Sequence, residues 1–168
     1  MLTLSILLWL HIFSAVGWLG AAMVFAMLIG PTIGTLTPGA RAEIVTKLFP
    51  KYVRYAEAFS LMTVIFGDAL VLDLGNGDMS IFSMSGVYRL ISVGAVLALL
   101  AVILAFTVVT PSARKVHRLT VEMVKNSTTP PPELMKASVR LRVSSSVGLV
   151  LLILVLVFMV AGTTGVTG

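Results

Sequence analysis

The chain contains no cysteine, which excludes disulfides, iron–sulfur clusters, thiolate-ligated metal sites and covalently attached c-type haem. Histidine is almost as scarce, because the sequence holds only His11 and His117. A di-haem cytochrome with two histidines on each iron needs four of them in its membrane helices. This chain therefore cannot form such a centre by itself.

Charged residues are also few. They make up 11% of the sequence, against about 25% in an ordinary soluble domain, while hydrophobic residues make up 58%. A soluble protein of this composition would lack the polar side chains needed to cover its surface. The composition therefore predicts that the main partner of this chain is the lipid bilayer.

Four apolar stretches are long enough to cross the hydrocarbon core of a membrane, which takes about 20 helical residues. They predict transmembrane helices at about 4–29, 52–74, 86–110 and 134–161. The first helix is expected to end at Pro31 and the third span at Pro111, after which residues 113–125 could extend the helix into the cytoplasm. The fold class that follows is all-α, an integral membrane four-helix bundle with a single transmembrane domain over 1–168.

The loops between these helices differ in charge. Eleven of the twelve Lys and Arg residues lie within 41–54 or 114–142. The positive-inside rule then makes 31–51 and 111–133 the cytoplasmic loops of a multi-pass cell-membrane protein. The turn at 75–78 and both termini face outward, so the bundle is N-out and C-out. Nucleic acid is not an expected partner, because the basic residues flank apolar spans rather than forming a patch with interleaved aromatics.

Three ionisable side chains fall at a similar depth near the outer face, and such groups in a membrane mark functional or pairing sites. They are His11 in the first helix, Asp68 in the second and Arg89 in the third. One interpretation pairs Asp68 with Arg89 and makes His11 a packing residue. The other makes His11 a haem ligand, with Asp68 orienting the imidazole and Arg89 pairing a haem propionate.

A second polar layer is predicted near the inner face. Arg54 and Glu57 in the second helix are placed to meet Arg140 and Arg142 in the fourth. Basic groups at helix ends commonly form interfacial ion pairs, so we interpret this layer as structural.

Methionine is the other residue type that binds haem or copper. Met23 and Met27 are four residues apart in the first helix, and Met79 and Met84 lie near the outer loop. A thioether pair favours Cu(I), whereas methionine at helical spacing in an apolar span usually serves packing. The catalytic motifs of soluble hydrolases, P-loop proteins, zinc proteases and dinucleotide-binding enzymes are absent, so the sequence assigns no catalytic residue.

The first helix contains the pattern L-H-x6-W-x-G, formed by Leu10, His11, Trp18 and Gly20. This pattern resembles the opening helix of the CopD-like copper-resistance membrane proteins and of the HemJ-type protoporphyrinogen oxidases. The resemblance implies His11 as a ligand of haem b, Trp18 as a pocket wall and Arg89 as a basic partner. The HemJ type is expected to carry a lysine where this chain has Arg89.

Three functions are therefore compared. The first is a haem-b-binding membrane protein of redox or electron-transfer function, with His11 as the axial ligand. The second is a copper-handling protein of the CopD type, in which four spans would need a homo-oligomer to complete a transport path. The third is a subunit of a larger membrane complex with no cofactor, in which the charged layers are structural.

Overall fold

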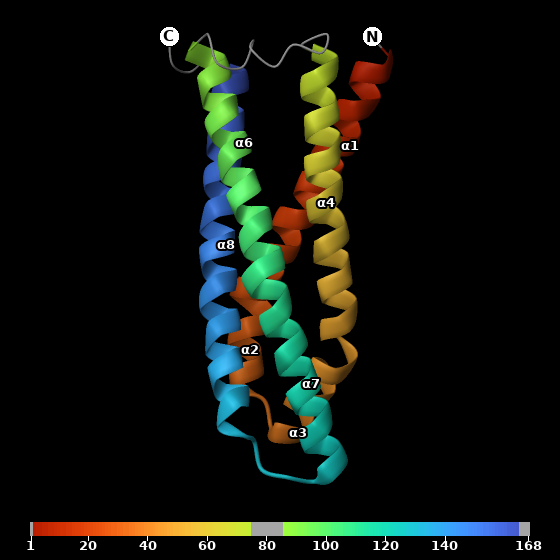
Figure 1. Cartoon of the computed structure of the whole chain (residues 1–168), viewed down its shortest axis with the longest axis vertical. Coiled ribbons are helices and arrows are strands. Elements are labelled where there is room, and N and C mark those ends of the chain that lie inside the picture. Colours follow the sequence, from red (N-terminus) through yellow and green to blue (C-terminus); the bar gives the residue numbers. More distant parts are fainter. Residues whose placement is uncertain (1, 75–85, 165–168) are drawn as a thin grey trace. The chain divides into compact units, whose positions relative to one another are not determined.

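The computed structural model describes residues 2–74 and 86–164 of the chain (Figure 1). No strand occurs within these two ranges, and the all-α prediction is confirmed. The predicted turn at 75–78 and the candidate ligands Met79 and Met84 lie outside the described residues. The helical elements follow one another in the order α1 (Leu2–Met23), η1 (Val24–Ile29), α2 (Gly30–Thr35), α3 (Pro38–Lys47), α4 (Phe49–Leu74), α6 (Gly86–Leu104), η2 (Ala105–Val109), α7 (Thr110–Asn126) and α8 (Pro132–Thr164).

Within the described residues, four helical stretches are long and apolar enough to cross a membrane. They run over Leu2–Thr35, Phe49–Leu74, Tyr88–Asn126 and Pro132–Thr164. Large apolar side chains on these helices point outward, and Trp9, for example, is 73% exposed. Such surfaces need lipid around them, which makes the chain a multi-pass membrane protein of the helical-bundle class.

The chain forms two compact units, and each of the four long stretches contributes to both. Unit 1 consists of Met1–Leu19, Ala58–Val102 and Val150–Gly168. Unit 2 consists of Gly20–Glu57 and Ile103–Leu149. All four residues that the sequence marks as a cofactor site belong to unit 1, whereas the basic loops belong mainly to unit 2.

The first helix does not end at its proline, contrary to the prediction, and the third continues through Pro111 into the helical extension that the sequence allowed over 113–125. Each widens into a π-helical turn just before the proline and then continues as α2 or α7. In these wide turns the N–H of Gly30 donates to the Phe25 carbonyl and that of Thr110 to the Ala105 carbonyl, five residues back. A proline ring in a regular helix clashes with the carbonyl four residues back. The wider turn moves that carbonyl aside.

The core of unit 2 is built around aromatic rings. The Phe25 ring stacks on the Tyr52 ring with centroids 5.0 Å apart, and it meets the Phe49 ring edge-on at 5.7 Å. The Tyr52 hydroxyl donates to the Ala21 carbonyl at 3.1 Å, so its polar end is satisfied inside the core. Around these rings pack Val45, Val53, Ala113, Val116, Ala137 and Leu141.

The Arg41 side chain caps the C-terminal end of α2. Its Nε donates to the Ile33 carbonyl at 3.0 Å, and its Nη2 donates to the carbonyls of Gly34 and Leu36. The last carbonyls of a helix have no intrahelical partner, and a cation there also complements the helix dipole. Thr37 then begins α3 by accepting a hydrogen bond from the N–H three residues later.

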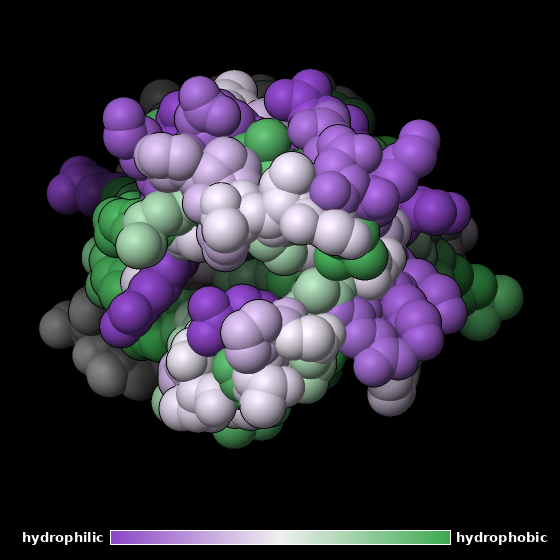
Figure 2. All heavy atoms as spheres, turned by 90° about the horizontal axis from the view of Figure 1, so that it is seen from below, coloured by the Kyte–Doolittle hydropathy of each residue, from purple (hydrophilic) through white to green (hydrophobic). Residues whose placement is uncertain are grey.

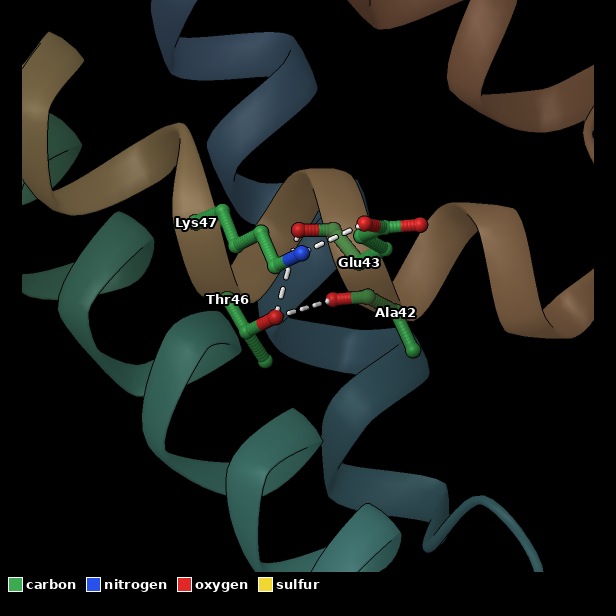
Figure 3. Close-up of polar contacts among 4 residues, drawn as sticks. All are labelled: Ala42, Glu43, Thr46 and Lys47. Carbon is green, nitrogen blue, oxygen red and sulfur yellow. Dashed lines mark hydrogen bonds and ion pairs between the residues drawn. The ribbon is translucent and has the colours of Figure 1, made fainter.

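The surface of α3 carries an exposed ion pair one helical turn apart (Figure 3). Lys47 Nζ lies 2.6 Å from Glu43 Oε1, and the Thr46 hydroxyl donates to the Ala42 carbonyl at 2.8 Å. The hydrogen bond from Lys47, together with its charge, lowers the pKa of the Glu43 carboxyl below its usual value. The end of unit 2 that includes α3 and α7 shows hydrophilic residues around its rim (Figure 2).

Candidate functional site

His11 in α1 is held by the backbone of α4. Its Nδ1 lies 2.9 Å from the carbonyl oxygen of Thr63. A carbonyl oxygen only accepts, so Nδ1 must carry the proton of this hydrogen bond. In the neutral ring, Nε2 is then the nitrogen with a free lone pair. This contact therefore selects one tautomer and one orientation of the imidazole.

Gly67 lies against the same ring, one helical turn beyond Thr63. A Cβ added to Gly67 would come 2.9 Å from His11 Cε1 and 3.1 Å from Nδ1. Any side chain at this position would therefore displace the imidazole. The space left by Gly67 and the hydrogen bond to the Thr63 carbonyl together fix the imidazole against one turn of α4.

Elsewhere in unit 1, α1 and α4 meet through the Phe13 and Phe59 rings, whose centroids are 5.7 Å apart, and small residues lie beside this contact. Ser14 and Ser60 are completely buried, and the Ser14 hydroxyl donates to the Leu10 carbonyl at 2.6 Å. A Cβ added to Gly17 would overlap the Phe59 ring. Small residues allow helix backbones to approach closely in a membrane, and this approach brings His11 within reach of a carbonyl on α4.

Trp18, the predicted pocket wall, is a buried side chain with 6% exposure. It follows His11 by seven residues, which puts the two on nearly the same face of α1, two turns apart. The two aromatic residues of the L-H-x6-W-x-G pattern therefore lie on one face of α1: His11 is hydrogen-bonded to α4, and Trp18 is buried.

Asp68 and Arg89 do not form the predicted pair. Both side chains are exposed, and the described residues show no ion pair with either. Gly67 faces α1, so Asp68 lies about 100° further round α4 and away from the imidazole. The Thr63 carbonyl takes the position beside His11 that the sequence analysis assigned to the Asp68 carboxylate.

In the inner polar layer, Glu57 forms an ion pair with a different arginine from those predicted. Arg114 Nη2 lies 2.6 Å from Glu57 Oε1, and the Glu57 side chain is only 18% exposed. Arg140 and Arg142 are exposed and take part in no ion pair of the described ranges, so the predicted contacts between them and Glu57 are wrong. The helical extension beyond Pro111, α7, carries Arg114 to Glu57, a contact that the sequence did not indicate.

The described part of the chain contains no group of three or more His, Asp or Glu residues that could hold a metal ion. His11 therefore belongs to no such group within these ranges. The sequence analysis also missed Thr63 and Gly67, although Ser60, Thr63 and Gly67 recur at helical spacing. That spacing of small residues was the available signal for the helix face that meets α1.

Comparisons with protein-family models, with curated proteins and with solved structures found no match. The fold and the site define a class: a helical membrane protein whose first long apolar stretch carries a histidine, His11, that is hydrogen-bonded to a neighbouring helix.

Proposed function

We propose that this chain is a haem-b-binding membrane protein of redox or electron-transfer function, with His11 as the axial ligand. One observation supports the proposal more than any other. The Nδ1–H of His11 donates to a backbone carbonyl, which directs the lone pair to Nε2. Histidines that ligate metals commonly have their second ring nitrogen held in this way.

The donor set favours haem over copper. A haem iron needs only one protein ligand to become five-coordinate, whereas a closed copper site needs several ligands from the protein. In the described residues His11 belongs to no group of three or more His, Asp or Glu side chains. When bound, haem would supply one-electron chemistry between its ferric and ferrous states.

The residues of the proposed haem site have separate roles. His11 would hold the iron through Nε2, while the Thr63 carbonyl fixes the ring and Gly67 leaves space for it. Trp18 walls the site, and the exposed guanidinium of Arg89 is available to a propionate. Asp68 has no part beside the imidazole, because the Thr63 carbonyl occupies that position.

The proposed orientation is N-out and C-out in the cell membrane. It rests on the Lys and Arg residues, which lie at one end of the predicted spans, within 41–54 and 114–142. His11 would then lie in the outer half of the bilayer. Electron partners would approach from that side, either as a second copy of this chain or as another subunit of a membrane complex.

The test is a visible absorption spectrum of the detergent-purified protein, oxidised and then reduced with dithionite. We expect a b-type spectrum in the wild type that is lost or shifted in His11→Ala. His117→Ala is the matched control, because it removes the only other histidine from a polar helix of unit 2. A colourless wild-type protein, expressed with adequate haem supply, would refute the proposal and would direct attention to copper binding and to co-purifying subunits.

A further inference from the structure

Unit 2 contains a pocket of about 270 Å³ where α4 and α7 begin. Its walls combine apolar surface with three nitrogen-bearing side chains. The proposed haem site uses none of these residues, so the pocket needs a separate explanation. Its lining consists of Phe49, Pro50, Val53, Arg54, Ala113, Arg114 and His117.

The polar side of this pocket is cationic. Arg54 is exposed and has no ion pair within the described ranges. Arg114 uses Nη2 to hold Glu57, and a guanidinium has further N–H donors on its other nitrogens. His117 is partly buried at the same wall, and no carboxylate of the described residues lines the pocket. Paired guanidinium groups of this kind recognise phosphate.

The pocket also lies where apolar spans give way to basic sequence. Phe49 and Pro50 begin α4, the second membrane-crossing helix, and Arg114 follows the apolar α6 and η2 by only a few residues. Where a membrane-crossing helix ends, the polar headgroup region of the bilayer begins. Basic pockets between membrane helices bind anionic headgroups there.

We infer that this pocket binds the phosphate of an anionic phospholipid. Arg54 and Arg114 hold the phosphate oxygens from two helices, and His117 adds a hydrogen bond. The glycerol end of the lipid lies along the apolar wall formed by Phe49 and Val53. The volume is near the lower end of the range of about 300–1,000 Å³ for small-molecule pockets, which suits a headgroup rather than a whole lipid. A choline headgroup would bring a second cation beside the guanidiniums, so charge complementarity favours an anionic lipid.

The first arm of the test compares headgroups on the full-length protein in a non-ionic detergent. Dioctanoyl phosphatidylglycerol is titrated and binding is followed by microscale thermophoresis. Dioctanoyl phosphatidylcholine has the same chains and serves as the headgroup control. Inorganic phosphate and glycerol 3-phosphate supply the anion without acyl chains. We expect saturable binding of phosphatidylglycerol, with the other three compounds binding at least tenfold more weakly.

The second arm uses two substitutions that remove the same charge. Arg54→Gln alters the pocket, whereas Arg118→Gln alters an exposed position of α7 outside it. Because one cation near a lipid surface contributes about 1 kcal/mol, Arg54→Gln should weaken phosphatidylglycerol binding about fivefold. Arg118→Gln should leave binding unchanged. The melting temperature of each variant verifies that it is folded.

A third variant probes Arg114, whose loss alone would leave the Glu57 carboxylate without this partner. Arg114→Gln combined with Glu57→Gln removes both charges, and we expect weaker binding despite the unchanged net charge. Three results would overturn the inference. These are equal binding of phosphatidylcholine, equal losses in Arg54→Gln and Arg118→Gln, and inorganic phosphate binding as tightly as phosphatidylglycerol. The last result would assign the pocket to a soluble phosphate compound.

Discussion

Gly67 leaves the space that the His11 ring occupies, because a Cβ built on this glycine would lie 2.9 Å from the imidazole Cε1. One turn earlier on the same helix, the Thr63 carbonyl accepts the hydrogen bond from Nδ1. The two contacts come from backbone atoms of α4. The position of the only histidine in α1 thus depends on how closely another helix approaches it.

Gly67→Ala should therefore destabilise the protein by about 1–2 kcal/mol, because the new methyl group must push the imidazole away from its acceptor. Alanine is intrinsically better in a helix than glycine by about 1 kcal/mol, so a net loss would mark a steric effect. The measurement is unfolding by SDS titration in mixed micelles. Gly20→Ala is the control, since no heavy atom lies within 4 Å of a Cβ built there. It should be neutral or slightly stabilising.

A second prediction concerns Gly17 and Phe59. Gly17→Ala should cost about 1–3 kcal/mol, because its methyl group would overlap the Phe59 ring. In Phe59→Ala the ring is absent, and adding Gly17→Ala to that background should cost little. The double-mutant cycle measured by the same unfolding titration should give a coupling of about 1 kcal/mol or more. Additive effects of the two substitutions would show that the helices do not meet in this way.

The ion pair between Glu57 and Arg114 should contribute measurably to stability. The Glu57 side chain is 18% exposed, so its charge is less screened than one at the surface. Glu57→Gln keeps the shape and a neutral hydrogen bond but loses the charge, and we expect a loss of about 1 kcal/mol in the free energy of unfolding. Glu57→Gln should also lose most of its effect in the Arg114→Gln background. Equal costs in both backgrounds would contradict the pairing.

The pair between Glu43 and Lys47 should behave differently, because both side chains are mostly exposed. Lys47→Gln should lower the melting temperature only slightly and raise the pKa of Glu43, since the hydrogen bond and charge of Lys47 lower that pKa. A carboxyl whose pKa is lowered in the folded state adds stability above its unfolded pKa. That contribution is lost as the pH falls through the lowered pKa. Carboxyl ¹³C titration by NMR measures the shift, and an unchanged pKa in the variant would exclude the contact.

Much of the architecture follows from the sequence. Lipid excludes unpaired backbone polar groups, so apolar stretches of this length have to be helical. This reasoning predicted the helical fold and the four membrane-crossing stretches. It also singled out His11, because an ionisable group in an apolar helix needs a partner.

Which residues contact His11 was decided by the tertiary structure. Nδ1 of His11 bonds a backbone carbonyl, and every residue has one, so no residue type identifies Thr63 as the acceptor. Proline indicates a disturbed helix but does not by itself distinguish an end from a wider turn, and the structure has wide turns before Pro31 and Pro111. Composition and length determined which segments are helical. Helix rotation and register, set by small residues in contact, decided which side chains meet.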